Sequence, residues 1–362
     1  MSYPLRDQYH RARKALGRGL NRLWPSGDFA ALAVPLMRAT RPNEDDAGPA
    51  ILPDQARQYL ADRRGKTEEE AVYRLSVPVT VDPKMGILFH RGRVLWGSSD
   101  QPERERNPRF FSHLRKPGRV LSEAVLLHHV HGDNYFHFFL YVLSKAAVAE
   151  FAGIPDTIPL LVPEGTARTG FFKRAVEAGV FGKRQLIVQG KREVVRVETA
   201  HVVRVWFNDR RYHGWIAERL RPEAPSGSRR LFVLRGANAA NGRQFRNQDK
   251  VSALAQAYGF ELVDPAGLDL VQQAALFSTA GVLLGAHGAG LTNLIFRAGA
   301  PCHIIELFSP TMGSPQYYML ARELGFTYES QMTLAPEGRG FTATTEVDLA
   351  ELERALKALP AV

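Results

Sequence analysis

The stretch Gly281-Val-Leu-Leu-Gly-Ala-His-Gly-Ala-Gly-Leu-Thr-Asn293 joins a short apolar strand, a glycine-rich turn that holds one histidine, and the apolar start of a helix. Such a turn lets backbone approach a phosphate, because Gly285, Gly288 and Gly290 can adopt positive φ and carry no side chain. The amides that follow would open a helix whose N-terminus carries partial positive charge, and His287 adds a donor or a cation. The stretch therefore predicts a nucleotide or a phosphorylated sugar as the ligand.

The same stretch has a purely structural alternative, since any parallel strand that feeds a helix needs a turn and glycine suits it. The histidine between the glycines favours a ligand site. The order Gly-x-x-Gly-x-Gly differs from the dinucleotide-binding fingerprint, and the stretch lies late in the chain. The sequence therefore argues against a nicotinamide-dependent dehydrogenase.

Short apolar strands alternate with amphipathic helices on both sides of this stretch. Strands are expected at 231–234, 260–263, 282–284, 304–307 and from 326 onward. Helices are expected near 251–258, 268–279, 317–324 and 349–359. This alternation predicts a parallel sheet covered on both faces, with ligands beyond the carboxyl ends of its strands, where the turn at His287 must lie.

The remaining chain predicts a second α/β domain, and 362 residues suffice for two domains of ordinary size. Strands are expected at 73–81, 86–96, 119–127, 158–162 and 185–188, and helices at 135–151 and 169–180. The segment 221–229 has the composition of a linker. The expected organisation is a basic amphipathic segment at 1–40, an irregular linker at 41–70, an N-terminal α/β domain at 71–225 and a C-terminal α/β domain at 226–362.

The formal net charge of +10 predicts attraction to an anion, for which nucleic acid, acidic lipid and nucleotide phosphate all qualify. Apolar residues recur every three or four positions among arginines over 1–24, so this segment predicts a basic amphipathic helix. It would either lie on an anionic membrane or pack on the protein, and it lacks the apolar core of a signal peptide. The uncharged stretch 270–296 is interrupted by polar residues and glycines, which favours buried elements over a membrane span. The single cysteine, Cys302, excludes an intramolecular disulfide and predicts a small buried side chain.

A run of arginines precedes the glycine-rich turn in the sequence. Arg235 follows the expected strand 231–234, on the sheet edge that also carries His287, and Arg243 and Arg246 come after it. Guanidinium groups at that edge would grip a diphosphate in bidentate fashion. A solvated arginine-rich loop is the alternative, which we favour for Arg243 and not for Arg235.

The segment His128-His-Val-His-Gly-Asp-Asn-Tyr-Phe-His137 holds four histidines and one aspartate ahead of an apolar helix. Zinc would accept the His-x-His spacing, but the sequence has no second compact ligand set and no His-Glu-x-x-His pattern, so a metal site is disfavoured. Asn134 is expected to cap the helix and to place His137 on its first turn, where the helix dipole lowers a histidine's pKa and suits it to act as a general base. For His128 and His129 we expect packing at a strand end.

Six segments of the chain resemble glycosyltransferase family 61, which includes bacterial polysaccharide-biosynthesis enzymes and eukaryotic xylosyl- and N-acetylglucosaminyltransferases. They run in the family's order: Asn134-Tyr-Phe-His137, Arg229-Arg-Leu-Phe-Val-Leu-Arg235 with Arg246-Asn247, Gly259-Phe-Glu-Leu-Val-Asp-Pro265, Gln273-Ala-Ala-Leu-Phe-Ser278, Gly285-Ala-His-Gly-Ala-Gly-Leu-Thr-Asn293 and Ile305-Glu-Leu-Phe308.

The resemblance implies a GT-B arrangement, with two Rossmann-like domains facing a cleft and a C-terminal helix. It implies a nucleotide-sugar donor held by the C-terminal domain, and transfer with inversion and without an essential metal. The residues that it places at the donor are Arg235, Arg246, Asn247, His287, Gly288, Ala289, Gly290, Asn293 and Glu306. A carboxylate at Glu306 would accept hydrogen bonds from a ribose diol, or it would pair with a nearby arginine.

Two positions depart from the family pattern. Tyr141 stands where the family often has an aspartate one turn after His137, and Gln248 stands where it often has a glutamate. The first departure bears on the general base, for which His137 ranks ahead of Asp133.

The sequence thus predicts an inverting glycosyltransferase that transfers a sugar to a hydroxyl of a growing cell-surface glycan, such as a bacterial capsule, exopolysaccharide or lipopolysaccharide. Its expected location is the cytoplasm, with peripheral contact at the inner membrane face through residues 1–24. The alternative is a non-catalytic nucleotide-sugar-binding protein with a degenerate active site, suggested by Tyr141. A nucleic-acid-binding protein is a third hypothesis that rests on charge alone, and outside the N-terminal helix the sequence does not show the interleaved basic and aromatic pattern that it needs.

Overall fold

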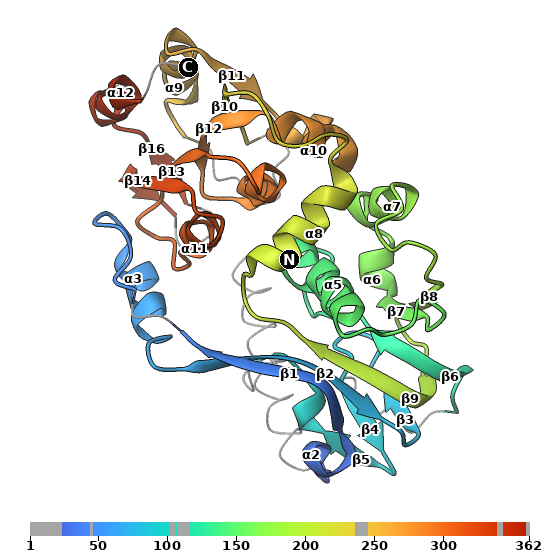
Figure 1. The fold of residues 1–362 in the computed structure, drawn as a ribbon. Coiled ribbons are helices and arrows are strands. Elements are labelled where there is room, and N and C mark those ends of the chain that lie inside the picture. The colour runs from blue at the N-terminus through green and yellow to red at the C-terminus, as the bar shows by residue number, and fades with distance from the viewer. Residues whose placement is uncertain are drawn as a thin grey trace, which may run out of the picture. The chain divides into compact units, whose positions relative to one another are not determined.

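The structure is a computed structural model that describes residues 24–43, 46–101, 106, 116–235, 245–338 and 343–359 (Figure 1). The chain divides into two units. Unit 1 takes in Met1–Thr40, Glu69–Lys173 and Phe181–Trp206, and unit 2 takes in Arg41–Glu68, Arg174–Val180 and Phe207–Val362. The basic helix expected at 1–24 falls almost wholly outside the described residues.

Unit 2 is built on a five-stranded parallel sheet with the strand order β11-β10-β12-β13-β14. Its strands are β10 (Arg229–Val233), β11 (Phe260–Val263), β12 (Ala280–Ala286), β13 (His303–Phe308) and β14 (Thr327–Met332). The parallel sheet predicted from the apolar runs is therefore confirmed, and each expected strand lies within one or two residues of its place.

Helices pack against this sheet as the alternating pattern predicted. The side chains of Val282 and Leu284 in β12 join a core with α9 (Gln248–Ala257) and α12 (Leu349–Ala358). A second group of helices packs around the 3-10 helix η6 (Ala289–Arg297), which follows β12. This group comprises α8 (Arg210–Leu220), α10 (Leu270–Phe277) and α11 (Gln316–Glu323), with the short η5 (Pro265–Gly267) before α10 (Figure 1). Each fully buried aliphatic side chain of such a core contributes about 1.5–3 kcal/mol.

The segment 41–70, expected to be an irregular linker, contains a helix, so the expectation of irregular structure was wrong. Helix α3 (Asp54–Ala61) places Ala56 and Leu60 one turn apart, where both are buried in a cluster with Phe308 and Met312. Two apolar residues among many charged ones give a weak periodicity, and the burial against distant residues is invisible in the sequence. The segment also contains the end of β1 (Val34–Pro42) and the start of β2 (Thr67–Leu75).

Unit 1 contains a mixed sheet in the order β5-β4-β3-β9-β6-β7-β8, with β2 also paired to β9 and β1 paired to β2. Strands β6, β7, β8 and β9 run parallel to their neighbours among themselves, whereas β2 and β3 run antiparallel to β9. The bounds are β3 (Val79–Val81), β4 (Leu88–His90), β5 (Arg93–Leu95), β6 (Arg119–Leu126), β7 (Leu160–Pro163), β8 (Leu186–Gln189) and β9 (Val195–Arg204). The molecule is thus a mixed α/β protein with parallel sheets.

The central strand β9 and helix α8 were not expected from the sequence. Charged residues and a histidine interrupt β9, and its buried positions shift from alternating to consecutive after Thr199. Such a strand gives neither a clean period of two nor a continuous apolar run.

The helices of unit 1 include the apolar helix expected at 135–151, which forms as one continuous helical segment in three parts. These parts are α4 (Tyr135–His137), the π-helical η4 (Phe138–Leu143) and α5 (Ser144–Phe151). The other helices are α2 (Phe29–Leu32), η1 (Trp96–Ser98), α6 (Glu164–Ala167) and α7 (Gly170–Glu177), the last of which continues into unit 2. A short antiparallel pair, β15 (Leu334–Glu337) and β16 (Thr344–Glu346), completes unit 2.

Residues 270–296 form α10, β12 and η6, so the choice of buried elements over a membrane span is confirmed. Within the described part of the chain, no helix has both the length and the apolar character needed to cross a bilayer. Cys302 is buried, as expected, and burial raises the pKa of its thiol to about 12.

Candidate functional site

The glycine-rich turn after β12 owes its shape to close packing and not to positive φ. Gly288 is extended, with φ 174° and ψ 166°, and neither Gly285 nor Gly290 has positive φ. A Cβ atom on Gly288 would lie 3.0 Å from the Arg235 guanidinium, and one on Gly290 would lie 2.8 Å from Val233. None of the three glycines therefore uses the positive φ that glycine permits, and the close contacts mean that a larger residue would have to displace its neighbours.

Arg235 lies beside the turn, as its place after β10 predicted. Its Nη1 donates a hydrogen bond of 3.0 Å to the backbone carbonyl of His287, which sits directly beyond β12. Because β10 and β12 are parallel neighbours, both residues emerge at the same sheet edge. The half-buried residues Ala289 and Gly290 begin η6 at that edge, so a cationic side chain and a helix start are adjacent.

The imidazole of His287 is held by the carboxylate of Glu306. Its Nδ1 bonds to Oε1 of Glu306, and the other carboxylate oxygen accepts a 2.5 Å hydrogen bond from Tyr328. Burial and the Glu306 carboxylate raise the pKa of Tyr328 well above its usual value, so its hydroxyl stays protonated and donates. The rings of Phe308 and Tyr317 pack against His287, with centroids 4.8 and 5.0 Å away. The imidazole is therefore fixed in orientation on all these sides.

Glu306 does not fit the direct ribose contact considered from the sequence. It lies within β13, its exposed fraction is 0%, and both of its oxygens are bonded to protein side chains. Its place in the register, opposite Gly285, puts it beneath the turn and not at the open strand end. The role consistent with these contacts is to orient His287.

Asn293 also acts within the protein. Its amide nitrogen donates to Gln273 and to the backbone carbonyl of Gly290, each at 3.0 Å, and its side chain is fully buried. Gln273 in turn donates to the carbonyls of Pro265 and Leu268. These bonds tie the start of η6 to α10 and fix the position of the turn.

Arg246 and Asn247 contact the β15–β16 pair. Arg246 bonds to the carbonyl of Ala335 at 2.9 Å and lies 3.2 Å from Glu337, while the Asn247 amide exchanges two hydrogen bonds with the backbone of Val347. The structure thus brings Arg235, His287 and Glu306 together but gives Arg246 and Asn247 other partners. Arg243 lies outside the described residues.

In unit 1, Asn134 caps the helix that carries His137, as predicted. Its Oδ1 accepts from the amide of Phe136 at 3.0 Å and from that of His137 at 3.4 Å. Burial, together with the neighbouring His129 and His131, lowers the pKa of His137 to about 3. The predicted direction of the shift is confirmed, but burial and adjacent imidazoles cause it instead of the helix dipole.

His129 has more than the packing role expected for it. Its Nε2 lies 3.0 Å from Nδ1 of His137, and its Nδ1 lies 3.0 Å from the Gln101 amide nitrogen and 3.6 Å from Asp100. The Tyr141 ring stacks on His129 at 4.1 Å and nearly parallel. These contacts connect His137 to a carboxylate through a second imidazole.

The Asp100 carboxylate, to which His129 connects His137, is itself paired with a buried lysine. Lys145, which is 5% exposed, lies 2.7 Å from Asp100 and donates to the backbone carbonyl of His128. Burial alone would raise the pKa of the Asp100 carboxyl, but Lys145 and His129 hold it well below its usual range. Asp100 therefore stays ionised beside His129.

The other predicted residues of this region divide between packing and exposure. His128 is buried and bonds to Gln189 at 2.8 Å, and burial lowers its pKa to about 3, which confirms the packing role. Asp133 is exposed and lines a cavity of about 110 Å³ together with His129 and Lys191. Among the described residues, no group of three or more His, Cys, Asp and Glu side chains is arranged to hold a metal ion.

The glycine-rich turn and the start of the helix that carries His137 both lie in a segment that is similar to known proteins. Residues 135–305 match the family model Glycosyltransferase 61. The chain is also 41% identical over 75 residues to the β-1,2-xylosyltransferase XAX1 of Oryza sativa subsp. japonica. That alignment covers 20% of this chain and 13% of the rice protein, so the chain spans a small part of that relative's length. The two similarities support a glycosyltransferase of family 61.

Three contributing residues, Asp100, Lys145 and Tyr328, were not predicted from the sequence, and His129 was predicted only to pack. Asp100 and Lys145 are far apart in the sequence and meet only through the fold, and Tyr328 reaches Glu306 from the neighbouring strand β14. His129 could have been recognised by the density of histidines around it, which the sequence does show. A lysine within an apolar helix, such as Lys145, is a second signal, because a buried lysine needs a partner.

Proposed function

We propose that this protein is an inverting glycosyltransferase that transfers a sugar from a nucleotide-sugar donor to a hydroxyl group of a glycan. In the step, the acceptor hydroxyl oxygen bonds to the anomeric carbon while the bond from that carbon to the diphosphate oxygen breaks. The acceptor proton passes to a base, and the diphosphate leaves with the electron pair. The observation that carries the proposal is that the matched segment 135–305 holds both the His137 helix start and the Arg235–His287 turn.

The turn of unit 2 carries groups of the kind that would stabilise a departing diphosphate. Arg235 lies against Gly288, and the η6 amides of Ala289 and Gly290 begin at the same edge. A guanidinium and a helix start stabilise developing negative charge without a cation, which is why we propose no essential metal. His287, oriented by Glu306, adds a positioned imidazole. Arg246 and Asn247 would enter only if their contacts to β15–β16 changed.

His137 is the proposed base, and its hydrogen bond to His129 admits two proton arrangements. If Nδ1 of His129 carries its proton toward Asp100, Nε2 of His129 accepts from His137, and Nε2 of His137 is left able to accept the acceptor's proton. If the Gln101 amide donates to Nδ1 of His129, the protons run the other way and Nε2 of His137 is already protonated. We propose the first arrangement, because the ionised Asp100 stabilises a proton on His129.

The role of Asp100 and His129 is therefore to position the base and its proton. Replacing Asp100 by Asn is expected to lower kcat, whereas replacing Gln101 by Leu should leave kcat unchanged or raise it. Asp133 is the second candidate base. An Asp133→Asn variant with full activity would exclude it, and a His137→Ala variant with full activity would exclude His137.

A non-catalytic nucleotide-sugar-binding protein is the alternative, since Tyr141 stands where the family often has an aspartate. Tyr141 stacks on His129 and on His137, so it fills the space beside the proposed base without adding a carboxylate. Donor binding without transfer or donor hydrolysis would favour this alternative.

The finer assignments follow from the resemblance and extend the proposal. We propose a GT-B arrangement for the two units, a pentosyl or hexosyl donor, and an acceptor in a cell-surface glycan, including those of bacteria. The name of the rice relative makes a xylosyl donor the first candidate. We further propose a cytoplasmic location with peripheral contact to anionic membrane through residues 1–24.

Donor binding tests the proposal most directly. The full chain would be titrated calorimetrically with UDP-, GDP-, CMP- and dTDP-sugars, with and without EDTA. One nucleotide class should bind, unaffected by EDTA, and Arg235→Ala should weaken binding at least tenfold. The matched control is Arg229→Ala, which removes an exposed arginine at the start of β10 that pairs with Glu261 of the neighbouring strand β11. No binding to a folded protein, or equal loss in both variants, would contradict the donor site.

A further inference from the structure

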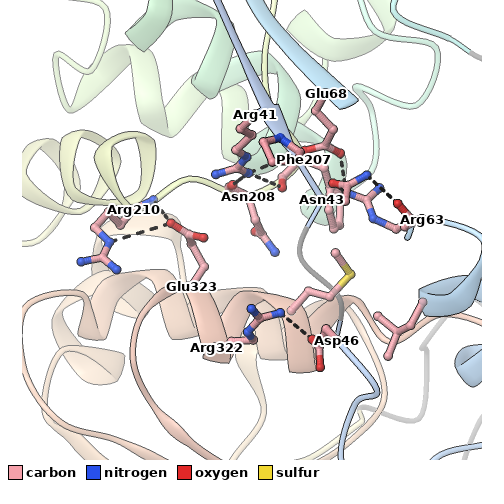
Figure 2. A pocket seen from close by; sticks show the side chains of 13 residues that line it. Arg41, Asn43, Asp46, Arg63, Glu68, Phe207, Asn208, Arg210, Arg322 and Glu323 are labelled. Carbon is pink, nitrogen blue, oxygen red and sulfur yellow. Dashed lines mark hydrogen bonds and ion pairs between the residues drawn. The ribbon is translucent and has the colours of Figure 1, made fainter. Parts of the chain in front are cut away.

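Unit 2 contains a cavity that the glycine-rich turn does not line. Its volume is about 200 Å³, and all of its lining residues belong to unit 2 (Figure 2). It is bounded by the end of β1, by α3, by the start of α8 and by α11. The lining residues used below are Arg41, Leu60, Glu68, Phe207, Asn208 and Met319.

The geometry of α11 separates this cavity from the donor turn. Tyr317 packs against His287, whereas Met319, Arg322 and Glu323 line the cavity. At 100° per residue, these three lie about 200°, 140° and 240° around the helix from Tyr317. One helix therefore contacts the turn with one face and the cavity with the opposite face.

The arginines around the cavity are neutralised by protein carboxylates. Arg41 lies 3.4 Å from Asp209 and 3.6 Å from Glu68, and Arg322 lies 2.6 Å from Asp46. Figure 2 shows the Arg322–Asp46 pair beside the cavity. Because each of these guanidinium groups already faces a carboxylate, the cavity offers a simple anion little net attraction.

Asn208 presents an unused hydrogen-bond donor to the cavity. Its side chain is 3% exposed, and its Nδ2 has no hydrogen-bond partner among the residues that the structure describes, although its Oδ1 is held by His213 at 3.1 Å. In Figure 2 the Asn208 amide points into the cavity. Its φ of 67° is a left-handed conformation that Asn tolerates better than most residues. A buried amide donor without a partner costs about 1–3 kcal/mol, so a ligand that accepts from it gains accordingly.

Glu68 presents to the same cavity a carboxylate oxygen that accepts no hydrogen bond from the described residues. This Oε2 is buried and lies 3.6 Å from Arg41, beyond hydrogen-bond distance, while its Oε1 bonds to Arg63. An anion could accept from Asn208 but would meet the Glu68 carboxylate, and a cation could only donate. A hydroxyl group does both, and a sugar ring carries several.

We propose that this cavity binds one neutral sugar residue of a glycan, at a subsite separate from the donor turn. The amide of Asn208 and the carboxylate of Glu68 would bind its hydroxyls, and Leu60, Met319 and Phe207 would contact its apolar ring face. A cavity of about 150 Å³ accommodates benzene, so about 200 Å³ accommodates a pyranose ring. The choice of a glycan as the ligand rests on the proposed function, whereas the neutral polyhydroxyl chemistry rests on the cavity.

Direct binding of free sugars tests this subsite without donor or transfer. The full chain would be titrated with xylobiose and cellobiose, and separately with glucuronate and inorganic phosphate, by ligand-observed NMR. A neutral disaccharide should bind with a dissociation constant on the order of 1–10 mM. Asn208→Asp should weaken it about five- to tenfold, because the amide donor becomes a second carboxylate.

A matched control separates the loss of the donor from the added charge. Gln256→Glu makes the same amide-to-acid change at an exposed position of α9 and should leave sugar binding unchanged. If Asn208→Asp does not fold, Met319→Trp fills the cavity while it keeps Asn208, and should abolish binding. Donor affinity, measured in parallel, reports on the proposed function separately.

Several outcomes would overturn the subsite. These are equal sugar affinity in wild type and Asn208→Asp, retained binding in Met319→Trp, and no binding of either disaccharide to the folded wild type. Binding of phosphate or glucuronate alone would replace it with an anion site. Sugar binding without nucleotide-sugar binding would uphold the subsite while the proposed donor site failed.

Discussion

The low pKa of His137 makes a quantitative prediction about the pH dependence of transfer. A base must be neutral to accept a proton, and it is neutral above its pKa. With its pKa near 3, about 99% of His137 is neutral at pH 5, whereas a histidine with the ordinary pKa of 6.5 would be only about 3% neutral. Wild-type kcat/KM should therefore be nearly equal at pH 5 and pH 7.5, and not about 30-fold lower at pH 5.

Removing the neighbouring imidazole should change this profile. His129→Phe keeps a ring to stack on Tyr141 but removes the nitrogen that lies 3.0 Å from His137. We expect kcat to fall about 10- to 100-fold, because the base loses its orientation and its proton arrangement. The acid limb should also move toward pH 6.5, because one of the imidazoles that lower the pKa is gone.

The matched control is His131→Phe, which removes an exposed histidine whose ring also lies near His137. Its kcat at pH 7.5 should remain within about twofold of wild type. Initial rates would be measured from pH 4.5 to 8.5, with circular dichroism at each pH to show that the protein is folded. A wild-type acid limb centred near pH 6.5, or a His129→Phe profile identical to that of wild type, would refute this account of the base.

Three further predictions concern packing, acid stability and membrane contact. Gly290→Ala should lower the free energy of unfolding by about 1–3 kcal/mol in denaturant titrations, since the new Cβ would lie 2.8 Å from Val233; an unchanged midpoint would show that the turn has room. His128 has its pKa lowered to about 3, so its contribution to stability is complete above pH 6.5 and is lost as the pH falls toward 3; at pH 5 the loss is roughly 2 kcal/mol. His128→Gln should therefore reduce the difference in unfolding free energy between pH 7.5 and pH 5 by about that amount, and an unchanged difference would count against the buried neutral histidine. Deletion of residues 1–24 should release the protein from anionic vesicles in a flotation assay while donor affinity is kept, and full vesicle binding after deletion would disprove the membrane helix.

The parallel sheet of unit 2 could be predicted because its strands are buried on both faces and are therefore almost continuously apolar. Leu231 to Val233 and Ile304 to Leu307 illustrate this, since every residue in both runs is buried. The same reasoning located the turn and Arg235, because carboxyl ends of parallel strands share one edge. Strand β9 carries charged residues along its exposed face and changes its pattern midway, so no periodicity marked it.

The network behind His137 could not be predicted, because its members become neighbours only through the fold. Asp100 follows η1, whereas Lys145 lies in α5, and no spacing rule connects them. The sequence identified the capped helix start and named His137 as the candidate base, but it assigned His129 to packing. For the glycines of the turn it allowed both positive φ and close contact, whereas Gly288 is extended and lies close to the Arg235 side chain.

Helix α11 spans only Gln316–Glu323, yet it contacts His287 with one face and the Asn208 cavity with the other. Two turns of helix move as one rigid body. A displacement of α11 by a sugar in the cavity would therefore shift the ring of Tyr317 and change its contact with His287. Thermodynamic linkage then imposes a symmetry: the factor by which a bound sugar changes donor affinity must equal the factor by which bound donor changes sugar affinity. A pair of titrations, each ligand measured with and without the other, would yield that coupling factor twice from independent data.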